Sequence, residues 1–418
     1  MQLPPRAALL ILIGMATAIA AGATADWMQW RGPSRDGTVP EGTAWPAALG
    51  KQSLVPLWEI PLGEGYSGPV MNSGAVFALE SRKDQTEAVQ ALDRKSGEVL
   101  WEASWPGSMK VPFFARKNGS WVRSTPSYDP DSGLLFAAGM RDVLVAIDAR
   151  SGDIRWQVDF AEREGTELPA FGFVSSPLVV GPYLYVQAGC AVTKLDKLTG
   201  KTVWRALEIK NGMFGSAFSS VILEEMHGRP QIIAQTRTHL AGLDPDSGSE
   251  LWKYEVKAFR GMNILTPTRW GDSVFTATYG GGSFLFSVLD LDTELQAEKT
   301  WAIKTEGYMS SPVVVGDHVY LLGRDRHFHC LDLQTGETAW SSEEKFGEYW
   351  SIVRNGGRAL ALDQKGELLL LDLNPSEFRL IGRAEVSAKS PTWAHLAVSG
   401  DEIYVRSLKD LKAFRWEN

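Results

Sequence analysis

Five aspartates recur along the chain in the pattern Asp-x-x-x-Gly-x-x-x-Trp. The five copies are Asp93, Gly97 and Trp101; Asp148, Gly152 and Trp156; Asp196, Gly200 and Trp204; Asp244, Gly248 and Trp252; and Asp332, Gly336 and Trp340. Carboxylates that a fold brings together can bind a metal ion or act as acid and base on a substrate. The first question that the sequence raises is therefore whether these aspartates meet at one site.

The spacing within this repeat favours a structural role. Asp opens a turn because its short carboxylate accepts backbone N–H groups two residues on, and Gly four residues after it supplies the positive φ that closes such a hairpin. Trp then falls on the next strand, where it can cover apolar area and donate its indole N–H to a carbonyl group. With a degenerate copy that ends at Trp301, the copies are spaced by about 40 to 55 residues, which indicates one supersecondary unit per repeat and separates the aspartates around the fold.

A second marker, Ser or Thr followed by Pro, precedes an apolar run in most repeats. It occurs at Ser67-Gly68-Pro69, Thr125-Pro126, Ser176-Pro177, Thr266-Pro267, Ser311-Pro312 and Ser390-Pro391, and Ser220 and Ser351 fill two further places without Pro. Proline is tolerated at the first residue of a strand, where no ladder donor is needed. Eight strand starts, each followed by short β-rich runs and turn residues, predict eight antiparallel four-stranded sheets.

The last repeat, from Ser390 onward, contains only three strands, whereas residues 54–60 form an additional strand before the first repeat. Pairing this strand with the last repeat would remove two open sheet edges. The sequence therefore predicts an all-β fold: an eight-bladed β-propeller of four-stranded antiparallel blades, with the N-terminal strand closing the last blade. We expect the propeller to span residues 54–418, preceded by a leader, residues 26–53, whose Trp27 and Trp30 pack on it.

Residues 1–25 have the features of a signal peptide. Arg6 precedes an apolar run over residues 7–21, and Ala23-Thr24-Ala25 fits the small-x-small cleavage pattern. We expect an exported protein, periplasmic or secreted, with no transmembrane segment after cleavage; an uncleaved N-terminal anchor is the alternative.

The charge and cysteine content narrow the class of protein further. The formal net charge of −8 argues against a nucleic-acid-binding protein, which needs a basic face to displace counterions from phosphates. Cys190 and Cys330 are the two cysteines, and a domain of this size does not need a disulfide for stability. We expect both thiols to be free and buried.

The loops that lead into the first strand of each blade and the loops between the second and third strands share one face of the predicted ring, opposite the Asp-Gly turns. They are rich in aromatic residues and arginine, which can stack on and hydrogen-bond a planar, sugar or peptide ligand. The residues predicted to form a ligand or partner face are Arg123, Phe173, Phe218, Arg260, Tyr308, Arg324 and Trp350. The alternative is that these side chains pack against one another and close the channel.

Repeats such as LVAIDARSGDIRW and LAGLDPDSGSELW resemble the PQQ-like (quinoprotein-type) β-propeller repeat, over about residues 54–416. The resemblance implies either of two kinds of function. Quinoprotein dehydrogenases hold pyrroloquinoline quinone (PQQ) over the central channel; the alcohol dehydrogenases also have Ca²⁺, a catalytic Asp and a disulfide between adjacent cysteines. BamB-like propellers are non-enzymatic scaffolds of outer-membrane protein assembly.

The chain lacks adjacent cysteines and a C-x-x-C-H haem motif. We therefore expect no catalytic or metal-binding residues and neither PQQ nor Ca²⁺. The prediction is an exported, non-catalytic, monomeric propeller that acts as a protein-interaction scaffold or binding module in the cell envelope. Its expected partner is an envelope protein or a glycan. A PQQ-dependent quinoprotein oxidoreductase and a saccharide-binding propeller are the alternatives.

Overall fold

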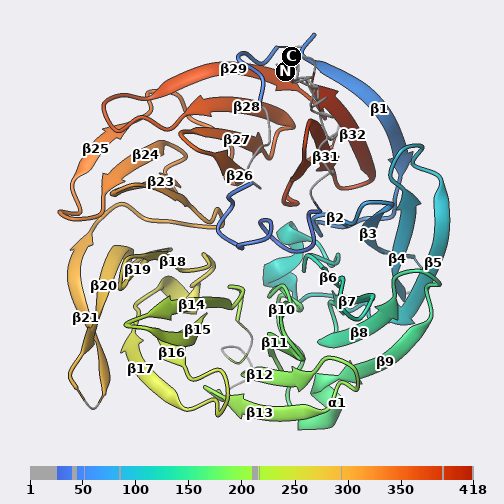
Figure 1. Cartoon of the computed structure of the whole chain (residues 1–418), viewed down its shortest axis with the longest axis horizontal. Helices are drawn as coiled ribbons and strands as arrows, with labels where there is room; N and C mark the ends of the chain where they lie inside the picture. Colours follow the sequence, from blue (N-terminus) through green and yellow to red (C-terminus); the bar gives the residue numbers. More distant parts are fainter. Residues whose placement is uncertain are drawn as a thin grey trace, which may run out of the picture.

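Short apolar runs separated by turn residues form eight four-stranded antiparallel sheets, which are arranged as a ring around a central axis (Figure 1). The computed structural model describes residues 26–39, 45–50, 52–83, 86–209, 215, 217–292, 294–387 and 390–416. The prediction of an all-β, eight-bladed propeller is confirmed. The predicted signal peptide, residues 1–25, and part of the predicted leader lie outside the described residues.

In each blade the first strand lies nearest the axis and the last strand lies at the periphery (Figure 1). Blade 1 contains β2 (Val70–Met71), β3 (Ala75–Ser81), β4 (Thr86–Asp93) and β5 (Val99–Pro106); blade 2 contains β6 (Ser127–Asp129), β7 (Leu134–Gly139), β8 (Val143–Asp148) and β9 (Ile154–Asp159). Blade 3 contains β10 (Leu178–Val180), β11 (Tyr183–Ala188), β12 (Ala191–Asp196) and β13 (Thr202–Ala206); blade 4 contains β14 (Ile222–Met226), β15 (Arg229–Gln235), β16 (His239–Leu243) and β17 (Glu250–Glu255).

The second half of the ring repeats this arrangement. Blade 5 contains β18 (Thr268–Trp270), β19 (Ser273–Thr278), β20 (Gly282–Asp290) and β21 (Leu295–Ile303); blade 6 contains β22 (Val313–Val315), β23 (His318–Leu322), β24 (Phe328–Asp332) and β25 (Thr338–Ser341). Blade 7 contains β26 (Trp350–Asn355), β27 (Arg358–Asp363), β28 (Glu367–Asp372) and β29 (Arg379–Glu385). Blade 8 contains β30 (Ala397–Ser399), β31 (Glu402–Arg406) and β32 (Asp410–Trp416), and β1 (Leu54–Pro61) completes it.

The predicted closure by the N-terminal strand is confirmed, because β1 pairs antiparallel with β32 from Leu54 opposite Trp416 to Pro61 opposite Asp410. The two ends of the propeller therefore belong to one sheet, in which β1 covers the edge that β32 would otherwise leave unpaired. Such an edge would offer free N–H and C=O groups to another chain.

The middle strands of the blades are buried on both faces because adjacent blades cover them. In β28 the four leucines 368–371 are all fully buried, and they pack between blades rather than alternating between core and solvent. The sequence of a strand that is covered on both faces is a continuous apolar run. The peripheral strands alternate instead, as in β5, where buried and exposed side chains follow one another.

The Asp-Gly-Trp repeat forms a contact between successive blades. In each of the five copies the Asp carboxylate accepts backbone N–H groups two and three residues later, and the Gly has a positive φ. The indole N–H of Trp101 donates to the carbonyl of Ala149 in the next blade at 3.0 Å, and Gly152 of that blade lies against the Trp101 ring. The equivalent indole bonds are those of Trp58, Trp156, Trp204, Trp301 and Trp340.

The other four repeat glycines have the predicted positive φ. They are also buried, and each lies beneath a tryptophan of the preceding blade: Gly97 beneath Trp58, Gly200 beneath Trp156, Gly248 beneath Trp204 and Gly336 beneath Trp301. A Cβ on Gly97 or Gly336 would lie 2.8 Å from its ring, closer than two such atoms can approach. The indole ring leaves no room for a side chain at these positions. The glycine is therefore required for the contact between blades as well as for the turn.

Trp252 departs from this arrangement. Its indole N–H donates to the side-chain oxygen of Gln231 in its own blade at 2.6 Å. The next blade lacks the Asp-x-x-x-Gly turn that would present a carbonyl group to it. The five aspartates themselves lie on five different blades, so they do not converge on one site.

The hydroxyl groups that precede the innermost strands link five blades around the axis. The backbone N–H of Thr125 donates to Ser176 Oγ at 3.1 Å, that of Ser176 to Ser220 Oγ at 2.9 Å, that of Ser220 to Thr266 Oγ1 at 3.0 Å, and that of Thr266 to Ser311 Oγ at 3.2 Å. The Ser/Thr marker thus satisfies an N–H group of the neighbouring blade as well as marking a strand start.

The marker assigned to the eighth blade is wrong in register. Ser390-Pro391 precedes β30 by several residues, and the position next to the axis is taken by His395 and Leu396. The N–H of Leu396 donates to Ser351 Oγ at 3.0 Å. The Pro after Ser390 resembled the other markers, but it lies in the loop that leads to the axis.

Three short helices lie in the loops of the described residues: η1 (Phe113–Asn118), α1 (Phe160–Glu164) and η2 (Phe259–Gly261). The sequence showed no amphipathic helix; α1 has a single turn, which Asp159 caps by accepting the N–H of Glu162 and which Gly165 ends at φ 63°. None of the helices that the structure describes has the length and apolar composition to cross a membrane.

We predict that Gly152→Ala destabilises the propeller more than Gly133→Ala does. Both glycines belong to blade 2 and have positive φ, but a Cβ on Gly152 would lie 2.7 Å from Trp101 Cε3, whereas no heavy atom lies within 4 Å of one on Gly133. Gly133→Ala should cost about 1 kcal/mol of unfolding free energy for backbone strain, and Gly152→Ala about 1–3 kcal/mol more for the displaced ring. Urea unfolding measures both, and equal losses would contradict the inter-blade contact.

Candidate functional site

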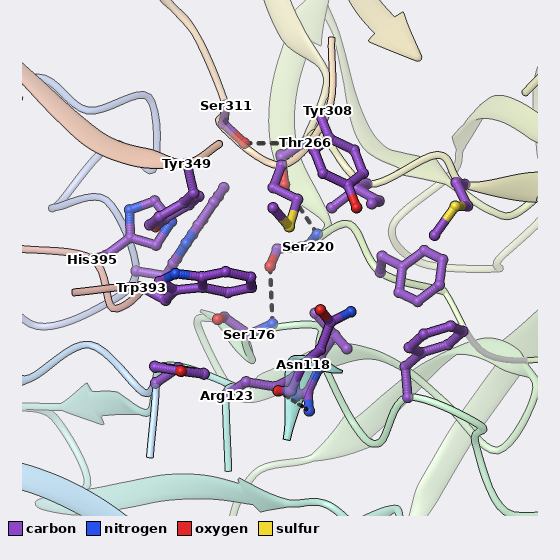
Figure 2. A pocket seen from close by; sticks show the side chains of 18 residues that line it. Asn118, Arg123, Ser176, Ser220, Thr266, Tyr308, Ser311, Tyr349, Trp393 and His395 are labelled. Carbon is purple, nitrogen blue, oxygen red and sulfur yellow. Dashed lines mark hydrogen bonds between the residues drawn. The ribbon is translucent and has the colours of Figure 1, made fainter. Parts of the chain in front are cut away.

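A cavity of about 150 Å³ opens at the axis on the face opposite the Asp-Gly turns (Figure 2). We call it the aromatic cavity. Its lining comes from the loops that lead into the first strands and from the leader, and it consists of Trp30, Tyr66, Asn118, Arg123, Phe171, Val174, Ser176, Phe218, Ser220, Met262, Ile264, Thr266, Tyr308, Met309, Ser311, Tyr349, Trp393 and His395. Aromatic and apolar groups with a few polar ones are typical of ligand sites.

One wall of the aromatic cavity is a stack of rings that starts at Trp121. Tyr66 contacts Trp121 edge-on, with ring centroids 5.4 Å apart, and lies nearly parallel to Trp393 at 5.3 Å. Tyr349 follows at 6.3 Å from Trp393. These rings come from blades 7 and 8 and from the loops on either side of blade 1, so their packing joins the two ends of the chain at the cavity.

A second series of rings leads from solvent to the cavity. Phe113 and Phe114 of η1 contact each other at 5.6 Å, Phe114 contacts Phe171 at 5.9 Å, and Phe171 contacts Phe218 at 5.3 Å. The guanidinium of Arg237 lies 4.4 Å from the centroid of the Phe218 ring. Because Phe113 is 79% exposed and Phe218 is buried, the series connects the outer rim to the cavity wall.

A third series lies on the side of blades 4 to 6. Phe259 contacts Tyr279 at 5.2 Å, and Tyr279 contacts Tyr308 at 5.4 Å. Arg324 lies over Tyr279 at 4.0 Å and forms an ion pair with Glu306 at 2.8 Å. Cation–π contact and ion pairing together hold this guanidinium at the rim of the cavity.

The first part of the leader, residues 26–39, contributes Trp30 to the floor of the aromatic cavity. The indole of Trp30 packs edge-on against His395 at 5.2 Å, and the guanidinium groups of Arg31 and Arg35 each lie 5.4 Å from the Trp30 ring. Burial and the nearby Arg31 charge lower the pKa of His395 to about 3. At neutral pH this imidazole is therefore uncharged and can pack as an aromatic ring.

The polar groups of the cavity are hydroxyls, Asn118 and Arg123. Figure 2 shows the backbone-to-hydroxyl bonds that join Ser176, Ser220, Thr266 and Ser311 along the wall. Arg123 donates to the carbonyls of Trp121, Asn118 and Gly119, and burial lowers its pKa to about 10. It therefore remains charged at neutral pH and is the cationic side chain of the lining.

The predicted partner residues occupy three kinds of position. Arg123, Phe218 and Tyr308 line the aromatic cavity. Arg260 and Arg324 are exposed at the rim, outside the lining. These five residues lie on one face of the ring, because all come from loops that join successive blades or from loops between second and third strands.

Phe173 and Trp350 require a correction. Phe173 is 2% exposed and packs edge-on against Phe160 between blades 2 and 3. Trp350 is 1% exposed and packs against Phe328 and Phe346 between blades 6 and 7. Both belong to the core between blades, so neither can contact a ligand in the cavity.

Most of the lining residues were not among those that the sequence assigned to the ligand face, and three of them are Trp30, Trp393 and His395. Trp393 and His395 were overlooked because the strand start of blade 8 was placed at Ser390. Aligning AVSG, which includes β30, with VVVG, which includes β22, puts His395 opposite Ser311 and would have found both. Trp30 was assigned to packing on the propeller, and no sequence signal placed it at the axis.

The residues of the aromatic cavity do not fit PQQ with Ca²⁺. PQQ carries several carboxylates, for which Arg123 is the single guanidinium in the lining. Its calcium is bound mainly by carboxylate and carbonyl oxygens, but the lining contains no Asp, Glu or Cys side chain. Across the described residues, no three His, Cys, Asp or Glu side chains are grouped to hold a metal ion. Both cysteines are free; Cys330 is buried as predicted, whereas Cys190 is only partly buried.

Comparison with known sequences decides the family. Residues 85–342 match a PQQ-like repeat family described as "Outer membrane protein assembly factor BamB". The chain belongs to this family. The resemblance to PQQ-like, BamB-like propellers that the sequence predicted is thus confirmed.

Relatives in the BamB family are distant in sequence. The BamB proteins of Kangiella koreensis and Moranella endobia are each 24% identical, over 53% and 66% of this chain and 53% and 64% of their own lengths. BamB of Shewanella oneidensis is 21% identical over 84% of this chain and 85% of its own length. The chain therefore spans about half to two thirds of the first two relatives and most of the third.

Solved structures share the fold. The crystal structure of BamB from Moraxella catarrhalis has a TM-score of 0.61 at 16% identity, covering 87% of this chain and 98% of that one. A quinohemoprotein alcohol dehydrogenase from Pseudomonas putida HK5 has a TM-score of 0.59 at 12% identity, covering 94% and 80%. At such identities these likenesses show the propeller fold alone, which an assembly factor and a dehydrogenase share.

A buried carboxyl group, that of Glu87 in β4, lies near Arg123, whose charge opposes the rise of the Glu87 pKa. Both oxygens of Glu87 lie 3.0 Å from the backbone N–H of Met140 in blade 2. Burial raises the pKa of Glu87 to about 8, and the Met140 bond only partly offsets this rise. Between about pH 4.5 and 8 the folded protein therefore keeps a proton on Glu87 that the unfolded chain releases, so its contribution to stability falls as the pH rises through this window.

We predict that Glu87→Gln flattens the pH dependence of stability. Wild type should lose unfolding free energy by up to about 1.4 kcal/mol per pH unit through this one group between about pH 5 and 8, whereas the neutral glutamine should remove that slope. Urea unfolding across this range measures the difference, and the exposed Glu98→Gln controls for the change in net charge. Parallel curves for wild type and Glu87→Gln would show that Glu87 is ionised in the folded state.

Proposed function

We propose that the chain is a non-catalytic scaffold in outer-membrane protein assembly and binds another envelope protein through the face that surrounds the aromatic cavity. The observation that carries this proposal is the set of aromatic series that run from the exposed rim into a cavity whose lining has no acidic side chain. Aromatic residues and arginine are enriched at the centres of protein interfaces, where they contribute most of the binding energy.

The rim exposes apolar side chains that a monomeric protein usually buries. Phe113, Phe114, Leu168 and Phe259 are all exposed and all lie in loops that join successive blades on the cavity side. Exposed apolar side chains that gather around a cavity are typical of a binding surface. The ring of blades fixes the positions of these loops, so a partner meets a surface that is largely formed before binding.

The family description supports both the kind of process and the compartment. The relatives are named as outer membrane protein assembly factors, and the signal-peptide features of residues 1–25 point to export. We propose that the chain works in the periplasm as a monomer. Periplasmic scaffolding would use binding alone, so no catalytic group is needed.

The two alternative functions have less support. A quinoprotein oxidoreductase would need cofactor and metal ligands that the described lining does not provide. A saccharide-binding propeller could use the Tyr66–Trp393 stack, but the exposed phenylalanines at the rim have no role in that function. The protein-binding proposal uses both features.

We predict that Phe113→Ser combined with Phe114→Ser weakens partner binding about tenfold or more, because two apolar contacts at the rim are lost. Photo-cross-linking in the envelope fraction, followed by mass spectrometry, should identify outer-membrane assembly proteins with wild type and far fewer with the variant. Leu198→Ser is the matched control, since Leu198 is 62% exposed but lies in an Asp-Gly turn on the opposite face.

Other results would overturn the proposal. Equal cross-linking by the rim variant and the Leu198→Ser control would move the partner to another surface. Dye reduction by purified protein supplied with PQQ, Ca²⁺ and an alcohol or sugar would support the quinoprotein alternative. Glycan-array binding that Trp393→Ala abolishes would support the saccharide alternative.

A further inference from the structure

A second cavity lies on the other side of the leader, towards the Asp-Gly turns. It has a volume of about 270 Å³ and is lined by four arginines, Arg31 and Arg35 of the leader, Arg269 of β18 and Arg354 of β26, together with Asp36 and Glu224. We call it the arginine cavity. The leader separates it from the aromatic cavity, since Trp30 lines one and the neighbouring Arg31 lines the other.

Arg31 and Arg35 are buried charges whose hydrogen-bond partners are neutral. Arg35 donates to the carbonyls of Ser176 and Pro177 at 2.9 and 2.7 Å and to the amide oxygen of Gln29, and Arg31 donates to the carbonyls of Asp36 and Pro312. Neither forms an ion pair with a carboxylate of the described residues. Buried charges in proteins are normally paired with an opposite charge, so this cavity has an uncompensated positive charge.

Three buried donor atoms of the lining have no partner within the described part of the chain. They are the Nε atoms of Arg31 and Arg35 and the hydroxyl of Thr268 in β18. Leaving a buried donor unsatisfied costs about 1–3 kcal/mol, and such groups in a folded protein point to a water, an ion or a ligand. All three groups can donate to an anion.

The two carboxylates of the cavity can balance at most two of its four arginines, and both ion pairs are long. Arg269 is 3.8 Å from Glu224 and Arg354 is 4.0 Å from Asp36, both longer than the 2.7–2.9 Å of a charge-assisted hydrogen bond. Burial raises the pKa of Glu224 to about 7, an effect that Asp36 reinforces and Arg269 opposes. Glu224 is therefore partly protonated near neutral pH.

We propose that the arginine cavity binds a tetrahedral oxyanion of the phosphate or sulfate class, either as a free ion or as the phosphoryl group of a larger molecule. Guanidinium forks match the oxygen spacing of such anions and donate to them in pairs. Arg31 and Arg35 provide buried charge, the Thr268 hydroxyl provides a neutral donor, and the partly exposed Arg269 and Arg354 close over the anion from the solvent side. This site is independent of the proposed partner face, which lies beyond the leader.

Isothermal titration of the full-length mature protein with sodium sulfate, at constant ionic strength set with chloride, tests this site. Sulfate is the first probe because its charge does not change near pH 7. We expect saturable binding of one sulfate per chain and about tenfold weaker binding by Arg269→Gln, which removes one charge-assisted contact. Thr268→Val, which removes the hydroxyl and keeps the volume, should also weaken binding.

Arg383→Gln is the matched control, because the Arg383 and Arg269 side chains are both 39% exposed and both ion-paired, but Arg383 lies on the peripheral strand of blade 7. It should bind sulfate as wild type does. Arg31 and Arg35 are not suitable for the test, since they also hold the leader in place. Thermal unfolding of each variant without sulfate checks that it is folded.

Inorganic phosphate and sn-glycerol 3-phosphate distinguish the two sources of the anion. Binding of both would show that the cavity accepts a phosphoryl group carried on a larger molecule, and binding of inorganic phosphate alone would restrict the site to free ions. No saturable binding of sulfate or phosphate by wild type would overturn the proposal. Equal weakening by Arg269→Gln and Arg383→Gln would overturn it as well, because the effect would then be one of net charge.

Discussion

The contact between a tryptophan of one blade and a glycine turn of the next determines how the sheets assemble. The indole needs a flat surface beside it and a carbonyl within reach, and both requirements are met where the turn has a glycine at positive φ, as at Gly152 beneath Trp101. A side chain at the glycine would displace the ring. Replacing the tryptophan by a residue without a side-chain N–H would remove the hydrogen bond to the carbonyl. Because the contact recurs between most neighbouring blades, it fixes the angle at which each sheet follows the last.

At the inner ends of the blades, backbone polar groups need hydrogen-bond partners. Eight short strands approach the axis, and their first N–H and C=O groups would be buried there without partners. Hydroxyls of the next blade accept the N–H groups, as Ser176 does for Thr125, while carbonyls such as that of Pro177 accept from the leader arginines. The same strand starts therefore contribute hydroxyls to the aromatic cavity and bind the residues that line the arginine cavity.

The sequence predicted what depends on local pattern. The Asp-Gly turns, seven of the eight strand starts and the pairing of residues 54–60 with the last repeat rest on turn chemistry and edge pairing, and each is visible in a short stretch of chain. The burial of a loop residue is not local. Phe173 and Trp350 were assigned to a ligand face because of their loop position, but neighbouring blades cover them, and His395 was missed because one Ser-Pro pair resembled the wrong marker. The buried charges of Arg31 and Arg35 could not be predicted, since nothing in their surrounding sequence indicates that the leader crosses the axis.

The path of the leader has a consequence for the order of assembly. Its backbone bonds to Met71 of blade 1, to Tyr128 of blade 2 and to Arg354 of blade 7, and its arginines bond to blades 3 and 6. This docking surface does not exist until blades from both halves of the chain stand in the same ring. The leader precedes every blade in the sequence, yet it must be among the last segments to reach its final position. The pairing of β1 with β32 closes the ring, and the hydrogen bonds of the leader then hold blades from both halves of the chain together.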